Sequence, residues 1–386
     1  MTALASGPVQ ELVQIAPATQ SWNHRSLSAL IEDFPDRALA DMYRRTRLVF
    51  DEIAERKLPR WVVTFSGGKD STLTALLAVD YISELPTPPN LSVVYSDTLL
   101  EIPAMRVAAE EMLVHLRRVG KARKLPIQVH VVRPAVENTY WVRMLGRGYP
   151  PPKPKFRWCT RRLKIEPAAP FVTSGEPTAV LTGVRYGESA GRTARLHATC
   201  ATGGECGQDY WASKGPQGSG VTYFAPIVHW TTCKVWDFLH MIAPEAGWPT
   251  QTVYALYGDS SLRFGCWTCT LVRRDRTIEA LIERDQDATL RELHAFREFM
   301  WAESRVPKNR QVRNGHLAAL TPEFRRELLD QLLALQSRVG KRLITAEEVT
   351  TIRRLWRNPN PPGSPNPQPS ASGGLPGTTI RQQTWS

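Results

Sequence analysis

Residues 66–71, with the sequence SGGKDS, combine the residue types that bind a phosphate group. Adjacent glycines let the backbone approach an anion closely, and the start of a helix supplies free N–H groups and partial positive charge. Lys69 adds a full positive charge, and Ser66 and Ser71 add hydroxyl donors. The pattern is neither the Walker sequence GxxxxGK[ST] nor the GxGxxG of dinucleotide folds. It predicts a nucleotide site, against the plainer interpretation of an ordinary strand–helix turn.

A second segment, residues 143–164 (RMLGRGYPPPKPKFRWCTRRLK), carries eight Lys and Arg residues and no acidic residue. Such a run is usually a solvated loop. Three aromatic residues and Cys159 interrupt this one, which indicates an ordered surface near an anion. The sequence GVRYGES at 183–189, with Arg192 after it, adds two arginines suited to a bidentate grip on phosphate or sulfate. Glu188 could hold an arginine in place; surface salt bridging is the alternative for Arg185 and Arg192.

The six cysteines, Cys159, Cys200, Cys206, Cys233, Cys266 and Cys269, are better suited to metal ligation or catalysis than to disulfides in a reducing compartment. Cys266 and Cys269 form a CxxC pair, and Cys200 and Cys206 lie in a glycine-rich stretch that must be a loop. Cys233 precedes an amphipathic helix and is predicted to be a packed thiol. Cys159, the CxxC pair and one of the two loop cysteines make a four-thiolate set, which suits a [4Fe–4S] cluster or zinc. Free thiols are the third alternative.

These motifs resemble known families. Residues 66–71 look like the PP-loop of the ATP pyrophosphatases, and WCTRRLKIEP at 158–167 together with GVRYGES resembles the phosphoadenosine-phosphosulfate (PAPS) reductase superfamily. The order of SGGKDS, WCTRRLKIEP, GVRYGES, ECG, FAPIVHWTTCKVWDFL and RFGCWTCTLV is similar to that of the DndC/SspD-type proteins of DNA phosphorothioation. The recognisable motifs extend over about residues 40–275, and RFGCWTC is the most specific of them.

The resemblance implies a function. The enzyme would cleave ATP to AMP and pyrophosphate with Mg²⁺, adenylate a DNA backbone phosphate and prepare it for sulfur insertion, with a [4Fe–4S] cluster bound. The implied partners are DNA, a cysteine desulfurase as sulfur donor and other proteins of the phosphorothioation system. Asp70 would organise Mg²⁺ or the loop itself. Asp97 would lie at the nucleoside end of the site, although a turn or cap aspartate is at least as good an interpretation.

The expected site residues fall into four sets. They are Lys69, Asp70 and Arg185 for catalysis; Ser66, Gly67, Gly68, Lys69, Asp70, Ser71, Asp97 and Gly183 for ATP; Arg161, Arg162, Lys164, Arg185, Glu188 and Arg192 for phosphate; and Cys159, Cys206, Cys266 and Cys269 for metal, with Cys200 competing for the place of Cys206.

Three alternatives remain. A PAPS or adenylyl-sulfate reductase shares the fold, but the thiol-dependent members keep E-C-G-L-H near the C-terminus, whereas here ECG at 205–207 is internal. A tRNA-type sulfurtransferase typically carries two CxxC motifs, and this sequence has one. A cluster-bearing DNA-binding sensor with a vestigial nucleotide site is disfavoured by the intact loop.

The elements that must position these residues alternate along the chain. Short apolar runs predict strands at 61–65, 91–97, 126–134 and 178–185, and helical spacing predicts helices at 36–57, 72–85, 103–124 and about 166–174. This alternation predicts an α/β fold with a doubly wound, mainly parallel sheet. We expect an N-terminal extension at 1–35, the α/β domain at 36–275, a helical region at 276–357 and a disordered Pro/Gly/Ser-rich tail at 358–386. Thr321-Pro322 and the sequence TAEE at 345–348 predict helix starts.

Composition agrees with an anionic partner. The 386 residues include 49 Lys+Arg and 37 Asp+Glu, a net charge of +12, and the pI is near 9.6. Such a balance favours nucleic acid, nucleotide or an acidic surface. No apolar run approaches the ~18 residues of a membrane span, and the N-terminus lacks a secretory signal. We therefore expect a cytoplasmic protein that does not enter a membrane.

Overall fold

The computed structural model describes residues 26–173, 175–187, 205–206, 211–257 and 265–358, with the backbone alone at 205, 206 and 211. Most of the predicted N-terminal extension and nearly all of the predicted tail lie outside these ranges. Within them, no helix is long and apolar enough to span a bilayer.

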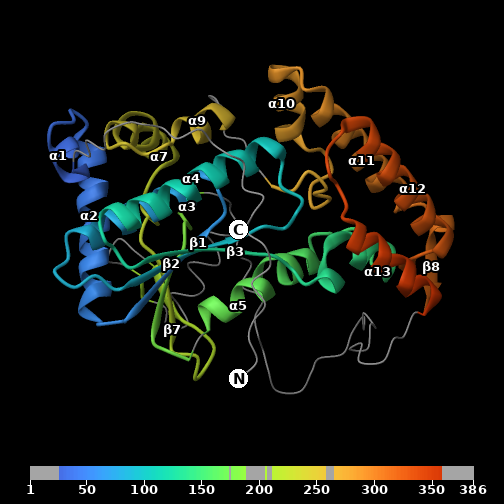
Figure 1. The fold of residues 1–386 in the computed structure, drawn as a ribbon, viewed down its shortest axis with the longest axis horizontal. Coiled ribbons are helices and arrows are strands. Elements are labelled where there is room, and N and C mark those ends of the chain that lie inside the picture. Colours follow the sequence, from blue (N-terminus) through green and yellow to red (C-terminus); the bar gives the residue numbers. More distant parts are fainter. Residues whose placement is uncertain (1–25, 174, 188–204, 207–210, 258–264, 359–386) are drawn as a thin grey trace.

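A seven-stranded sheet forms the centre of the fold, in the order β3-β2-β1-β4-β7-β6-β5 (Figure 1). Its strands are β1 (Arg60–Phe65), β2 (Asn90–Ser96), β3 (Ile127–Val132), β4 (Thr178–Leu181), β5 (Glu205–Cys206), β6 (Trp211–Lys214) and β7 (Val221–Ala225). The first five strands in the spatial order are parallel, and β6 and β5 add an antiparallel edge. The predicted doubly wound, mainly parallel sheet is confirmed, whereas the antiparallel edge was not predicted.

Helices cover both faces of this sheet because its strands are apolar on both sides. The helices before and between the strands are α1 (Leu27–Glu32), α2 (Arg37–Glu55), α3 (Lys69–Ser83), α4 (Pro103–Ala122) and α5 (Glu166–Val172). Trp61, Val63 and Phe65 of β1 share a buried cluster with α2, α3 and α4. Val62 points to the opposite face, where Val172 of α5 packs. Figure 1 shows α3 and α4 on one side of the sheet and α5 on the other.

The C-terminal helices build a second core with segments from the middle of the chain. They are α10 (Arg276–Asp285), α11 (Ala288–Glu303), α12 (Pro322–Val339) and α13 (Ala346–Arg357). Trp141, Trp158 and Trp267 are buried in the same cluster as these helices. The indole of Trp141 donates to the carbonyl of Leu343 at 2.9 Å, and that of Trp356 donates to the carbonyl of Leu145 at 2.7 Å. The helical region therefore shares its core with the segments that carry the cysteines.

A β-hairpin interrupts the region that the sequence predicted to be helical. Strands β8 (Arg310–Arg313) and β9 (His316–Leu320) pair in antiparallel fashion. Asn314 and Gly315 form the two-residue turn, with φ of 50° and 74°. Positive φ at both positions is what a type I′ hairpin turn requires, and Asn-Gly is the preferred sequence for it. This local signal is present in the sequence, and it places an unpredicted hairpin in a C-terminal region that is otherwise helical, as predicted.

Both predicted C-terminal helix starts are confirmed. Thr321 accepts a hydrogen bond from the Phe324 amide and begins α12. Thr345 begins α13 with a complete capping box, in which its hydroxyl accepts from the Glu348 amide and the Glu348 carboxylate accepts from the Thr345 amide. These bonds satisfy donors that the first turn of a helix leaves unpaired.

Replacing Thr345 by alanine should lower the free energy of unfolding by about 1 kcal/mol, because a helix N-cap is lost. Urea denaturation followed by circular dichroism measures the change. Thr345→Ser, which keeps the hydroxyl, should unfold within about 0.5 kcal/mol of the parent. Equal destabilisation by both variants would contradict the capping role.

Candidate functional site

The glycine loop lies between the carboxyl end of β1 and the first turn of α3, as predicted. Gly67 has a φ of +77°, a conformation that favours glycine, and a Cβ there would lie 2.7 Å from the Cβ of Ala109. Gly68 caps the helix in an extended conformation. Ser71 donates to the carbonyl of Gly68 at 3.0 Å and accepts from the amide of Ser66 at 3.2 Å. The loop is thus folded around its own serines, at the end of a helix suited to an anion.

Asp70 pairs with two positively charged side chains, those of Lys69 and Arg185. Its Oδ1 accepts from Nε of Arg185 at 2.6 Å, and its Oδ2 accepts from Nζ of Lys69 at 2.8 Å. Arg185 follows β4 and is only 2 % exposed, so it is buried rather than salt-bridged on the surface. It also donates to the carbonyl of Trp230 at 2.9 Å and to the hydroxyl of Thr232 at 3.2 Å. Arg185, which follows β4, thus links the first turn of α3 to the segment around Trp230 and Thr232.

Gly183 brings the end of β4 against the loop. A Cβ at this position would lie 2.8 Å from both the carbonyl carbon of Asp70 and the amide nitrogen of Ser71. Backbone atoms cannot move aside as a flexible side chain can, so the contact requires glycine. Gly183 therefore positions the loop through contact with its backbone.

Asp97 lies directly after β2 and is held on both oxygens. Oδ1 accepts from the amide of Leu99 at 3.0 Å, and Oδ2 accepts from Nε of Arg133 at 2.8 Å. Leu99 has a φ of 68°, a left-handed conformation that is uncommon for a residue with a side chain. The hydrogen bond from the Leu99 amide to the Asp97 carboxylate stabilises that turn. This geometry agrees with the interpretation of Asp97 as a turn aspartate.

Three of the predicted ligand cysteines lie next to the same end of the sheet. Cys266 forms a β-bridge with Glu101, just beyond β2, and its sulfur lies 3.5 Å from the hydroxyl of Thr98. The amide of Cys269 donates to the carbonyl of Cys266 at 3.0 Å, which closes the CxxC segment into a turn. Cys159 immediately precedes η3 (Thr160–Ile165), a π-helix. Short π-helical segments are rare and frequent at functional sites.

Electrostatics show that these thiols are neighbours. Burial raises the pKa of Cys266 to about 12, and burial also raises the pKa values of Cys159 and Cys269. The charge of Cys269 raises the pKa of both other thiols, while the ammonium of Lys164 lowers the pKa of all three. Tyr140, fully buried beside the three thiols, has its pKa raised chiefly by desolvation and further by each of them. The structure brings the three cysteines and one lysine together.

Among the described residues, no three or more His, Cys, Asp or Glu side chains are close enough together to hold a metal ion. The side chain of Cys206, as well as Cys200, Glu188 and Arg192, lies outside those residues. The thiol donor set suits iron–sulfur chemistry or zinc. The structure confirms neither.

Cys233 differs from its prediction. It is exposed, near the start of α7 (Thr232–Asp237), and not a packed thiol. The buried side of this short helix is formed by Val235, two residues later. Because the two positions point away from each other on a helix, Cys233 faces solvent.

Comparison with known proteins identifies the family of the chain. The family model of the phosphoadenosine phosphosulfate reductase domain matches residues 60–272, more than half of the chain. The chain belongs to this family. Two uncharacterized proteins of Methanocaldococcus jannaschii are 26 % and 24 % identical to it, over 61 % and 53 % of this chain. The chain covers 41 % and 40 % of these relatives, about two fifths of their length.

Two solved structures are similar over most of their own length. One is the PAPS reductase of Candida auris in its phosphate complex, with 17 % identity, a TM-score of 0.33, and coverage of 62 % of this chain and 94 % of that one. The other is the NH3-dependent NAD synthetase of Campylobacter jejuni subsp. jejuni, with 10 % identity, a TM-score of 0.32, and coverage of 72 % and 94 %.

Two predicted phosphate ligands of this PAPS reductase domain are paired with an acid. Arg161 donates to Glu166 at 3.0 Å, and Arg162 donates to both oxygens of Glu166 at 2.8 and 2.9 Å. The Lys164 ammonium instead lies near the thiols, and its backbone carbonyl accepts a 3.4 Å hydrogen bond from Ser96 at the end of β2. Of the three side chains, Lys164 is therefore the one that acts on the cysteines.

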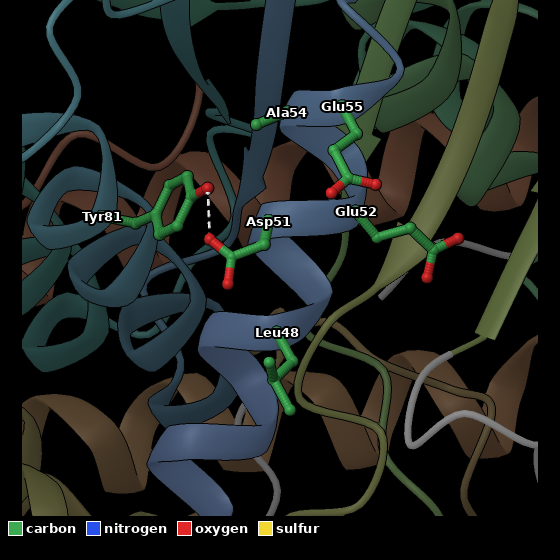
Figure 2. A pocket seen from close by; sticks show the side chains of 6 residues that line it. All are labelled: Leu48, Asp51, Glu52, Ala54, Glu55 and Tyr81. Carbon is green, nitrogen blue, oxygen red and sulfur yellow. Dashed lines mark hydrogen bonds between the residues drawn. The ribbon is translucent and has the colours of Figure 1, made fainter.

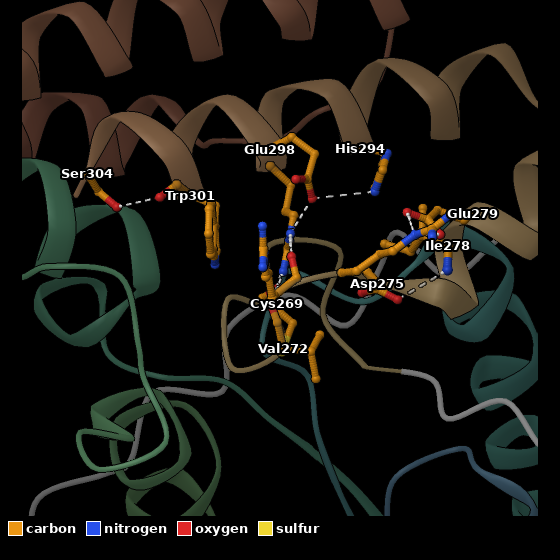
Figure 3. A network of polar contacts seen from close by, with 12 residues as sticks. Cys269, Val272, Asp275, Ile278, Glu279, His294, Glu298, Trp301 and Ser304 are labelled. Atoms are coloured by element: carbon orange, nitrogen blue, oxygen red, sulfur yellow. Dashed lines mark hydrogen bonds and ion pairs between the residues drawn. The ribbon is translucent and has the colours of Figure 1, made fainter. Parts of the chain in front are cut away.

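Sequence reasoning missed a buried arginine that supports the cysteine loop. Arg297 of α11 is 0 % exposed. It donates to the carbonyls of Cys269 and Arg273, both at 2.9 Å, and to that of Val272 (Figure 3). A possible signal was its place four residues after Leu293, on the apolar side of the helix.

A surface cavity of about 520 Å³ lies elsewhere, between α2 and α3 (Figure 2). Three carboxylates line it, those of Asp51, Glu52 and Glu55. Tyr81 donates to Asp51 at 2.7 Å. Negative charge of this density disfavours a nucleotide, so the cavity is not a second phosphate site.

Gly183→Ala should weaken the binding of ATP·Mg²⁺ by about tenfold or more. Overpacking costs roughly 1–3 kcal/mol, and here the added methyl group displaces the backbone of Asp70 and Ser71. Isothermal titration calorimetry measures the affinity, and circular dichroism checks the fold. Gly265→Ala is the matched control, because a Cβ there meets nothing within 4 Å and its φ lies outside the left-handed region. Equal affinities for both variants would contradict the role of Gly183.

Proposed function

We propose that the protein is an ATP pyrophosphatase of a DNA phosphorothioate modification system. It would convert ATP to AMP and pyrophosphate, adenylate a DNA backbone phosphate and prepare it for sulfur insertion. One observation carries the proposal: the glycine loop follows β1, and Cys266 of the thiol set pairs with Glu101, just beyond the neighbouring strand β2. β1 and β2 are parallel and paired up to Phe65 and Tyr95, so their carboxyl ends lie side by side. Nucleotide and sulfur chemistry would share one edge of the sheet.

The first step joins DNA to AMP. An oxygen of the DNA phosphate attacks the α-phosphorus of ATP, a P–O bond forms, and the bond to pyrophosphate breaks. The glycine loop would hold the leaving pyrophosphate, and Lys69 would meet the charge that develops on it. A bound Mg²⁺ would supply further positive charge there. Asp70, held by Arg185 and Lys69, keeps the lysine at the loop. In this proposal Asp70 organises the loop rather than the metal ion.

The second step replaces oxygen by sulfur. Sulfur from a cysteine desulfurase arrives as the outer sulfur of a cysteine persulfide. This sulfur attacks the adenylated DNA phosphorus, a P–S bond forms, and AMP leaves with the former phosphate oxygen. A thiolate then attacks the sulfur of the carrier cysteine, the S–S bond breaks, and the phosphorothioate is released. The disulfide formed in this step accounts for the two electrons, and an external thiol reductant restores the thiols. Lys164, beside the thiols, supplies positive charge where the anionic sulfur must arrive.

Cys159, Cys266 and Cys269 would hold a [4Fe–4S] cluster, with Cys206 or Cys200 as the fourth ligand. Such a cluster supplies a binding place for sulfur or electrons at this edge of the sheet. A four-thiolate cluster is negatively charged, and Lys164 is placed to offset that charge. Trp158 and Trp267, both buried and each adjacent in sequence to a ligand candidate, would keep water away.

The Lys69→Ala variant tests the nucleotide step. Anaerobically purified protein is incubated with ATP and Mg²⁺, with and without duplex DNA, and AMP and pyrophosphate are measured. The parent should release both in equal amounts, faster with DNA. Lys69→Ala should lose about 100-fold or more of this rate, the usual loss when one preorganised charge-stabilising group is removed.

Lys57→Ala is the matched control, since Lys57 is an exposed lysine before the amino end of β1, whereas the loop follows the carboxyl end of that strand. It should keep the parent rate. ADP as the product, or no turnover with any acceptor, would refute the proposal. Reduction of adenylyl sulfate or PAPS without ATP cleavage would establish the reductase alternative, and thiolation of tRNA would establish the sulfurtransferase alternative.

Cys266→Ser tests the cluster. Anaerobic protein should contain iron and acid-labile sulfide and show visible absorbance that dithionite bleaches. Cys266→Ser should lose most of the iron, whereas Cys233→Ser should keep it because Cys233 is an exposed thiol outside the proposed ligand set. Single replacement of Cys200 and Cys206 identifies the fourth ligand. Zinc in place of iron, or iron that survives Cys266→Ser, would contradict the assignment.

A further inference from the structure

The β8–β9 hairpin projects from the helical region with its tip in solvent. Every residue from 311 to 317 is exposed. Val312 and Leu317 face each other across the two strands and are 67 % and 43 % exposed. Directly opposed residues lie on the same face of a ribbon. Two aliphatic side chains therefore form a small apolar patch at the tip of the hairpin.

The hairpin and its flanks are uniformly basic. Residues 304–322 include Arg305, Lys308, Arg310, Arg313 and His316 and no acidic residue. Edge strands often carry cations that prevent aggregation. That explanation does not cover the apolar pair, because aliphatic side chains on an exposed edge favour aggregation. The combination of cations and an exposed aliphatic pair is better explained by a ligand.

The base of the hairpin is fixed to the body of the protein. Arg310 donates to the carbonyls of Ser304 at 3.0 Å, Leu317 at 3.2 Å and Ala318 at 2.8 Å. Burial and the nearby charge of Arg305 lower the pKa of Arg310. A rigid base with a projecting tip can present its side chains to a partner with little loss of conformational entropy.

The hairpin also adjoins the basic segment that leads to the cysteines. The amide of Leu320, the last residue of β9, donates to the carbonyl of Gly148 at 2.8 Å. Gly148 lies within residues 143–164, where Lys153, Lys155 and Arg157 are exposed. This segment ends at Lys164, beside the thiols. A basic segment of the chain thus leads from the contact with the hairpin at Gly148 to Lys164.

We propose that the β8–β9 hairpin grips duplex DNA by entering a groove, with Lys308 and Arg313 on the phosphates and the Val312–Leu317 pair against base edges. The major groove, about 12 Å wide, admits a two-stranded ribbon, and thymine methyl groups offer apolar contact there. Phosphate contacts by cations fix the position of a protein on the duplex. The inference rests on the proposed function for its choice of DNA, and it goes further by naming the element that holds the duplex.

Binding is measured without ATP, so its outcome is independent of catalysis. Fluorescence anisotropy with a labelled DNA duplex gives the affinity of the full chain over a range of salt concentrations. The double variant K308E/R313E should bind at least about tenfold more weakly. Its slope of log affinity against log salt should be smaller by roughly two, since each phosphate contact contributes about 0.9.

The double variant R44E/K57E is the matched control. It makes the same change in net charge at two exposed residues on or just after α2, at the opposite end of the molecule (Figure 1). It should bind within about twofold of the parent. Equal weakening by both double variants would overturn the proposal, because general attraction between a basic protein and DNA would then explain binding.

The apolar contact has its own test. V312S/L317S should weaken duplex binding severalfold while leaving the salt slope unchanged, because no charge is removed. Unchanged affinity, or parent binding to single-stranded DNA as tight as to the duplex, would overturn insertion into a groove. If hairpin variants lose DNA but the parent never cleaves ATP, the proposed function fails and the hairpin assignment stands.

Discussion

The buried ion pair between Arg185 and Asp70 is the interaction on which the rest of the site depends. It joins residues 115 positions apart and fixes the first turn of α3 against the segment that follows β4. Removing one partner from such a buried pair typically costs about 3–5 kcal/mol, because the remaining charge is left without a partner. The other donors of Arg185 reach Trp230 and Thr232, so the same guanidinium also holds the segment that begins α7. The conformation of the glycine loop is therefore a property of the whole sheet edge.

A second buried arginine does the same for the cysteines. Arg297 satisfies three backbone carbonyls of the segment that follows the CxxC turn. It comes from α11, in the C-terminal helical region, and that region shares its core with Trp158 and Trp267. Carbonyls that point from an irregular segment into the protein interior require donors, and the buried Arg297 of the helical region supplies them. This region is thus part of the scaffold of the site, although its helices lie far along the chain from the glycine loop.

The sequence predicts features whose causes are local. The apolar run of β1, the glycines after it and the capping threonines Thr321 and Thr345 all act within a few residues, and each is confirmed. Features set by distant contacts were missed. The side of α7 that is buried depends on what packs there, so the exposure of Cys233 could not be read from its helical spacing. Arg297 has partners 24 to 28 residues away, and no local pattern names them. The Asn314-Gly315 turn is different, because its signal is local but lies within a region whose overall pattern is helical.

The placement of charge around the thiols follows from which cations already have partners. Arg161 and Arg162 share Glu166, and Asp97 is held by Arg133. The single carboxylate of Glu166 offsets part of the charge of these two arginines and holds their guanidinium groups, and Asp97 offsets the charge of Arg133. Lys164 acts at the cysteines, and it lowers the pKa of three thiols that burial raises. Because positive charge stabilises thiolates and disfavours their protonation, one well-placed lysine changes the chemistry of the cysteines more than the count of eight basic residues suggests. Lys153, Lys155 and Arg157 of the same segment are exposed, so they can contact a partner in solution.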